Sequence, residues 1–226
     1  MENTLIRSLL PSVGVMIDVG ACHGKSHAPF SGWTVYAFEP DPDNRRHIPR
    51  RNGVHIDGRA LSDTVIDSAP YYRTHESAGM SSLLPFLDTH TEAFSVAVTT
   101  LDVATRELGI EQVDYLKVDA EGYDLQVLCG FPWHRLRPQV VMCEFGNSKT
   151  ELLGYTHDDL AAYLIGHGYQ VVLSEWVEAV KVSGRYQHKW LGYRRYPCEG
   201  HALYWGNMIA CRDDYLFGQL LKGCGL

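Results

Sequence analysis

The sequence predicts an α/β fold in which helices cover both faces of a mostly parallel sheet. Short apolar runs recur at residues 13–19, 34–39, 113–119 and 139–145, and each is followed closely by glycine or proline. Helical signals lie between these runs. Strands that alternate with helices form parallel, doubly wound sheets. At 226 residues, we expect a single domain spanning residues 1–226.

The first part of the chain is predicted to form a helix at 2–10, strands at 13–19, 34–39 and 54–61, and a helix at 42–51. The first helix ends before Pro11, because proline disfavours helical geometry in the preceding residue. The second strand is rich in β-branched and aromatic residues, which suit a pleated sheet. Pro40-Asp41-Pro42 opens the helix that follows it.

Residues 64–98 do not fit this alternation. Two runs that lean apolar, near 65–73 and 94–100, flank Gly79-Met80-Ser81-Ser82. We expect a hairpin or an insertion here, close to the mouth of a ligand site.

The rest of the chain is predicted to form helices at 100–108, 122–129 and 156–168, and strands at 113–119, 139–145, 169–175 and 202–211. Thr100 caps its helix and Gly109 ends it, while Thr156 and Asp159 resemble a capping box. No helix joins the last two strands, which favours an antiparallel strand at one edge. A second insertion is expected at 183–201.

Acidic residues stand at the ends of strands that are expected to be neighbours. Open α/β sheets bind ligands at the carboxyl ends of their strands. A dinucleotide fingerprint counted from Gly20 requires glycine where the chain has Cys22 and Lys25. S-adenosylmethionine (SAM) has no phosphates, so Gly20 and Gly24 can suffice, and we expect a SAM site.

Glu39 ends the second strand, where its carboxylate can accept two hydrogen bonds from a ribose diol. Asp18 is expected either to contact the amino-acid part of the cofactor or to cap a helix. Ser62 and Asp63 lie either beside the adenine amine or in a plain turn. The expected cofactor-binding residues are Asp18, Gly20, His23, Gly24, Glu39, Ser62, Asp63 and Asp119.

These residues resemble the FkbM family of SAM-dependent methyltransferases. The matching pieces are Ile17-Asp18-Val19-Gly20, Phe38-Glu39-Pro40, Ala60-Leu61-Ser62, Ser81-Ser82-Leu83, Thr100-Leu101-Asp102, Leu116-Lys117-Val118-Asp119-Ala120-Glu121-Gly122 and Cys143-Glu144-Phe145. The resemblance implies a class I methyltransferase fold (Rossmann-like), with strand order 3-2-1-4-5-7-6 and one antiparallel edge strand. It also implies O-methylation of a sugar, an oligosaccharide or a related natural product.

An alcohol needs a base or a metal ion to become a good nucleophile. The candidate catalytic residues are Asp119, Glu121, Glu144 and His201. In one hypothesis, Asp119 and Glu144 hold a divalent cation such as Mg²⁺. In the other, no metal is needed and Asp119 or a histidine is the base. Lys117, a charge inside a strand, either pairs with Glu144 or another acid or takes part in catalysis.

Aromatic and basic residues are concentrated near the C-terminus. They form either a wall for a sugar ring or a packed loop or subunit interface, so a homodimer stays open. These residues are Trp190, Tyr193, Arg194, Arg195, Tyr196 and Tyr204.

The net charge of −7 argues against a nucleic-acid partner. The six cysteines form no C-x-x-C pair, and the apolar stretch at 5–10 is too short for a membrane span. We therefore expect a soluble, cytoplasmic enzyme that acts on a small-molecule or oligosaccharide acceptor. The alternatives are a nicotinamide-dependent dehydrogenase, a nucleic-acid or protein methyltransferase, and a non-catalytic SAM-binding module.

Overall fold

The computed structural model describes residues 1–182, 185–198 and 205–226. The strands of its larger sheet are β1 (Val15–Val19), β2 (Thr34–Phe38), β3 (Val54–Asp57), β7 (Tyr115–Val118), β8 (Val140–Gly146), β9 (Gln170–Val182), β10 (Arg185–Arg195) and β11 (Trp205–Cys211). A smaller sheet contains β4 (Ala60–Leu61), β5 (Ile66–Arg73) and β6 (Thr91–Thr99). The helices are α1 (Glu2–Leu9), α2 (Pro42–Arg45), α3 (Leu101–Glu107), α4 (Asp124–Cys129), α5 (Asn147–Thr150), α6 (His157–Gly166) and α7 (Asp214–Cys224), with short 3-10 turns at Ala78–Met80 and Glu151–Leu153.

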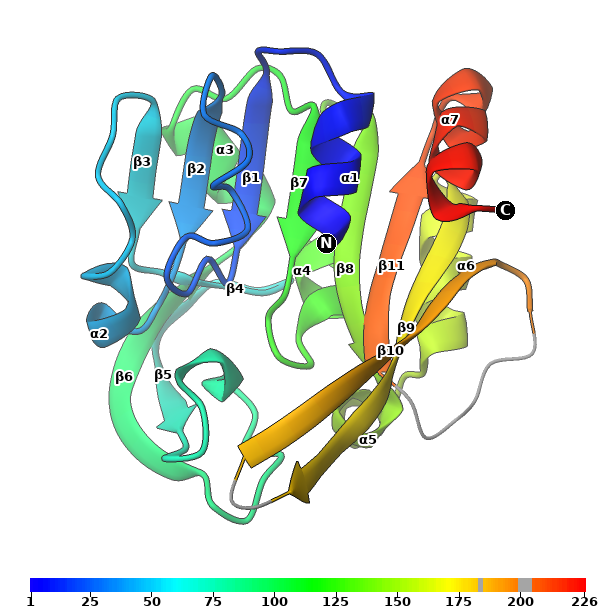
Figure 1. Cartoon of the computed structure of the whole chain (residues 1–226). Coiled ribbons are helices and arrows are strands. Elements are labelled where there is room, and N and C mark those ends of the chain that lie inside the picture. The colour runs from blue at the N-terminus through cyan, green and yellow to red at the C-terminus, as the bar shows by residue number, and fades with distance from the viewer. Residues whose placement is uncertain (183–184, 199–204) are drawn as a thin grey trace.

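Within these described ranges, the larger sheet has eight strands in the order β10-β9-β11-β8-β7-β1-β2-β3 (Figure 1). The five strands from β3 to β8 run parallel to one another. The α/β fold class with a large, mostly parallel sheet is therefore confirmed. The smaller sheet lies beyond the carboxyl ends of β1, β2 and β3.

The far edge of the larger sheet differs from the prediction. β11 is antiparallel, but it pairs with both β8 and β9 and so lies inside the sheet. The edge strand is β10, which is antiparallel to β9 and was not predicted. β9 also runs on to Val182 instead of ending at 175, and β10 pairs with both the expected part of β9 and this extension.

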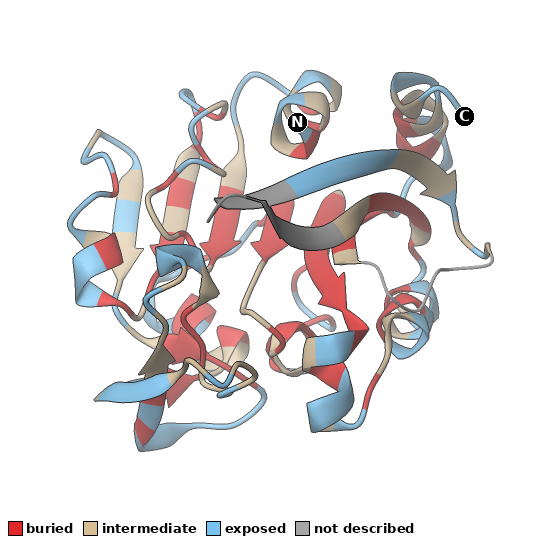
Figure 2. Cartoon of the chain, turned by 60° about the horizontal axis from the view of Figure 1, so that its bottom comes forward, coloured by how far each residue is buried: buried red, intermediate tan, exposed pale blue. Residues whose placement is uncertain are grey.

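Helices cover both faces of the larger sheet. α3, α4 and α6 pack on one face, and α1 and α7 pack on the other (Figure 1). The central strands β7 and β8 are buried along their whole length (Figure 2). Strands covered on both faces are expected to be apolar throughout, which explains the runs seen in the sequence.

Three other elements depart from the prediction. α2 ends at Arg45 instead of residue 51, and Pro49 disfavours helical geometry just before it. The strand expected at 54–61 splits, because β4 leaves the larger sheet to pair with β6. α7 was not expected, although the Asp213 side chain caps it by accepting from the Leu216 N–H.

A hairpin or an insertion was expected at 64–98, and the structure has β5 paired antiparallel with β6 there. The expected insertion at 183–201 lies partly outside the described residues and is otherwise strand β10. In the described part of the chain, no helix is long and apolar enough to cross a membrane.

Candidate active site

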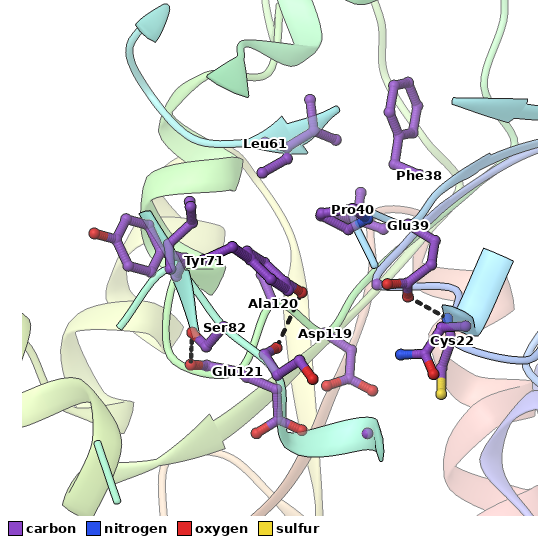
Figure 3. Close-up of a pocket in the computed structure, with 18 of the residues that line it drawn as sticks. Cys22, Phe38, Glu39, Pro40, Leu61, Tyr71, Ser82, Asp119, Ala120 and Glu121 are labelled. Atoms are coloured by element: carbon purple, nitrogen blue, oxygen red, sulfur yellow. Dashed lines mark hydrogen bonds between the residues drawn. The ribbon is translucent and has the colours of Figure 1, made fainter. Parts of the chain in front are cut away.

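A cavity of about 280 Å³ lies at the carboxyl ends of β1, β2, β7 and β8 (Figure 3). Residues 78–83, which follow β5, supply part of its wall. The lining residues are Val19, Gly20, Cys22, Phe38, Glu39, Pro40, Asn44, Arg59, Ala60, Leu61, Tyr71, Ala78, Gly79, Ser81, Ser82, Leu83, Asp119, Ala120, Glu121, Tyr123, Glu144 and Trp205. The cavity therefore occupies the edge of the sheet where a ligand site was predicted.

Glu39 is the acid at the β2 end of this cavity, and it is only 3% exposed. Its Oε2 accepts from the Cys22 N–H at 2.7 Å, and its Oε1 accepts from the Asp41 N–H at 2.9 Å. Burial raises the pKa of Glu39, although these two donors oppose the shift. Each carboxylate oxygen can accept a further hydrogen bond, so the side chain is held in place without being saturated.

Gly20 lets the ends of β1 and β7 approach each other. Its φ is +66°, in the left-handed region, and a Cβ at this position would lie 1.9 Å from the carbonyl oxygen of Asp119. No other residue fits there without moving the backbone. The requirement for glycine comes from this contact between backbones, whether or not a cofactor also approaches.

Asp18 is fully buried and is not among the lining residues. Its Oδ2 accepts from Ser26 Oγ at 2.5 Å and lies 2.7 Å from His27 Nδ1, while its Oδ1 lies 3.5 Å from Lys117 Nζ. Although burial opposes it, these partners, first among them the Lys117 charge, lower the pKa of Asp18. The structure thus places Asp18 in a buried polar network and not in the cavity lining.

Lys117 joins this network to the cavity. Its Nζ donates to the carbonyl oxygens of Val19 and Gly20 and lies 3.3 Å from Asp119 Oδ2. Its acidic partners are therefore Asp18 and Asp119, and not Glu144. Lys117 therefore links the end of β1 to the end of β7.

Four further predicted cofactor-binding residues are not among the lining residues. The ring of His23 lies 4.9 Å from the ring of His47. Gly24 lies against the ring of His27. Ser62 Oγ donates to Asp63 Oδ1 at 3.1 Å, so these two residues form a local pair.

Asp119 and Glu144, which were expected at the same edge, come together with Glu121, and one carboxylate oxygen from each lies within 4.8 Å of the others. Lys149, on α5, lies among them and was not predicted. Its Nζ is 2.5 Å from Glu121 Oε2 and 2.8 Å from Glu144 Oε2. Burial raises the pKa of both glutamates, and the Lys149 charge opposes that shift.

Asp124, the first residue of α4, binds the backbone beside this cluster. Its Oδ1 accepts from the Glu144 N–H at 3.0 Å, and its Oδ2 accepts from the Ala120 N–H at 3.3 Å. Burial raises the pKa of Asp124 to about 8, and the Glu144 charge adds to the shift. Asp124 therefore links the end of β7 to the end of β8.

The carboxylates do not fit the expected Mg²⁺ site at Asp119 and Glu144. Glu144 is already paired with the Lys149 ammonium, which also holds Glu121. A divalent ion here would lie close to a fixed positive charge. Mg²⁺ is therefore not supported.

Among the residues that the structure describes, no member of the predicted aromatic wall lines the cavity. The tryptophan that lines it is Trp205, which was not predicted and stacks on Trp176, with ring centroids 5.8 Å apart. Trp190 donates from Nε1 to Ser174 Oγ, and Tyr193 packs against the cluster beneath α1 and α7. His201 and Tyr204 lie outside the described residues.

Comparisons with known proteins identify the family of this chain. The model of the methyltransferase FkbM domain matches residues 18–171. No curated protein matches the sequence significantly.

Solved structures of methyltransferases match the chain at low identity. A precorrin-6y C5,15-methyltransferase from Geobacter metallireducens gives a TM-score of 0.48 at 14% identity, covering 92% of this chain and 85% of that one. An rRNA methylase from Streptococcus thermophilus gives 0.47 at 11%, with 94% of both chains covered. A TehB-like SAM-dependent methyltransferase from Corynebacterium glutamicum gives 0.45 at 13%, covering 94% and 87%. Likeness at this level carries no argument about fold, activity or acceptor.

Proposed function

Because this chain belongs to the FkbM family of SAM-dependent methyltransferases, we propose that it methylates a hydroxyl of a sugar, an oligosaccharide or a related natural product. One observation carries the proposal. A single cavity has a buried acid suited to a nucleoside at one end and a group of acids suited to proton transfer at the other. In the view of Figure 3, Asp119 lies between Glu39 and Glu121.

The part of the cavity at the carboxyl end of β2 fits the nucleoside half of SAM. Glu39 accepts hydrogen bonds from the ribose hydroxyls with the lone pairs that its two backbone donors leave available. The apolar side chains of Phe38, Leu61 and Ala120 line the same space and suit an adenine ring. Gly20 and Asp119 hold the remainder of the cofactor in the crevice between β1 and β7.

The part of the cavity at the carboxyl end of β8 fits an acceptor hydroxyl. SAM supplies an electrophilic methyl group on a sulfonium centre. Glu144 takes the hydroxyl proton on Oε1 while Lys149 holds its Oε2. The new O–C bond forms as the S–C bond breaks, and the proton stays on Glu144. A raised pKa suits this role, because a base works best when its pKa lies near the working pH.

Besides proton transfer, the site can speed the reaction by aligning the acceptor hydroxyl with the methyl group. Aligning two bound reactants can lower a barrier by about 7–11 kcal/mol. Ser82 Oγ donates to the Glu121 carbonyl oxygen at 2.9 Å, so the segment after β5 is fixed to the catalytic end. The wall that shapes the acceptor site therefore does not move independently of Glu121.

The test is transfer of labelled methyl from SAM to separate pools of saccharides, RNA and protein. We expect label on saccharide hydroxyls. Glu144→Gln should reduce kcat by ~10²–10⁴-fold while SAM affinity changes less than about twofold. Glu151→Gln, the same change at an exposed position, should leave both unaltered. Label found only on RNA or protein, or SAM binding without any transfer, would refute the proposal.

A further inference from the structure

Lys149 is placed by a tight connection between β8 and α5. β8 ends at Gly146, and the one-turn helix Asn147–Thr150 follows at once, which returns the lysine toward the end of its own strand. The side chain is only 15% exposed. The ring of Phe86, from the segment between β5 and β6, lies 5.2 Å from Nζ.

The surroundings of this ammonium are those of a bound cation. The side chains of Glu121 and Glu144 are 12% and 10% exposed, so their charges are largely removed from water. Leaving such charges uncompensated is costly. Nζ lies within hydrogen-bond distance of both carboxylates. Together with an oxygen of Asp119, their oxygens form a set of three carboxylate oxygens within 4.8 Å of one another. Sets of carboxylate oxygens are the ligands that hard divalent ions prefer.

We propose that the Lys149 ammonium is the resident cation of this site and replaces the divalent metal ion that its carboxylates would otherwise attract. It holds Glu121 and Glu144 side by side and makes methyl transfer independent of metal. Only this last consequence rests on the function proposed above. Lys149 is a positioning residue, because it is not among the residues that line the cavity.

The experiment removes the charge and asks whether a metal takes its place. The chain is treated with chelator, exchanged into metal-free buffer and titrated with Mn²⁺, with free Mn²⁺ followed by electron paramagnetic resonance. Lys149→Met keeps an unbranched side chain of similar length without the charge. Lys149→Arg keeps the charge and is the matched control.

The wild type and Lys149→Arg should bind no stoichiometric Mn²⁺. Lys149→Met should bind one Mn²⁺ per chain, at least ~10-fold more tightly than the wild type. Adding Glu144→Gln to Lys149→Met should abolish that binding. Lys149→Met should also transfer methyl slowly in chelator and faster with Mn²⁺, whereas chelator should leave wild-type turnover unchanged.

Two results would overturn the proposal. One is stoichiometric Mn²⁺ binding by the wild type, which is decisive even if Lys149→Met does not fold. The other is a folded Lys149→Met chain that binds no Mn²⁺. Since the titration needs no acceptor, the absence of methyl transfer would count against the proposed function alone.

Discussion

Glu39→Gln tests how the cavity holds the nucleoside. The two carboxylate oxygens of Glu39 accept from the backbone N–H groups of Cys22 and Asp41 at 2.7 and 2.9 Å. Glutamine keeps one oxygen, so its NH₂ group must face one of these donors. A buried donor without an acceptor costs about 1–3 kcal/mol. The free energy of unfolding should fall by about that amount.

The same substitution should also weaken SAM binding, and this effect is measured separately from stability. A hydrogen bond to a charged group contributes about 1.5–3 kcal/mol, and 1.4 kcal/mol corresponds to about tenfold in affinity. Loss of one ribose contact should therefore raise the Kd for SAM by about 10–100-fold. Calorimetric titration measures this directly, and urea unfolding without ligand measures stability.

Glu92→Gln is the matched control, since Glu92 is exposed on β6. It should change stability by less than about 0.5 kcal/mol and leave SAM affinity unaltered. A folded Glu39→Gln chain that binds SAM within about twofold of the wild type would show that Glu39 does not hold the ribose.

Two further predictions concern stability. Gly20→Ala places a Cβ 1.9 Å from the Asp119 carbonyl oxygen at a positive φ, so the free energy of unfolding in urea should fall by at least ~2 kcal/mol. Gly218→Ala is the control, because it lies inside α7 with nothing near its Cβ, and its free energy of unfolding should instead rise by ~0.5–1 kcal/mol. Similar losses in both variants would contradict the close contact at Gly20. Burial raises the pKa of Asp124 to about 8 and also raises that of Glu144, so the folded chain binds protons more tightly than the unfolded one. Stability is then fully present at low pH for these groups and is lost as the pH rises, from about 5 to about 8; unfolding free energies that increase over this range would be inconsistent with buried, proton-binding acids.

The parts of the fold that sequence predicts well are those whose pattern is local. β7 and β8 are buried on both faces, so each reads as an unbroken apolar run. β10 carries tryptophan, tyrosine and arginine at a half-exposed edge, and only its pairing with β9 makes it a strand. The antiparallel strand was correctly expected, but its position inside the sheet depends on that same tertiary pairing.

In the site, too, the features that follow from strand order were predictable and those that depend on tertiary contacts were not. Topology alone brings Asp119 and Glu144 to one edge, because parallel neighbours end together. Asp18 and Lys117 are register partners on β1 and β7, and their side chains meet in the core. The positions of the strand ends in the sequence do not predict this contact. Lys149 reaches Glu121 across 28 positions of sequence, and no periodicity in the chain indicates that contact.

We propose that SAM lies across the ends of β1, β2 and β7 with its ribose held by Glu39. The decisive measurement is a crystal structure of the protein with S-adenosylhomocysteine. We expect ligand density in the cavity that Glu39 and Asp119 line, with both ribose hydroxyls within hydrogen-bond distance of the Glu39 carboxylate. Density at another place on the molecule, or a ribose that does not touch Glu39, would contradict it.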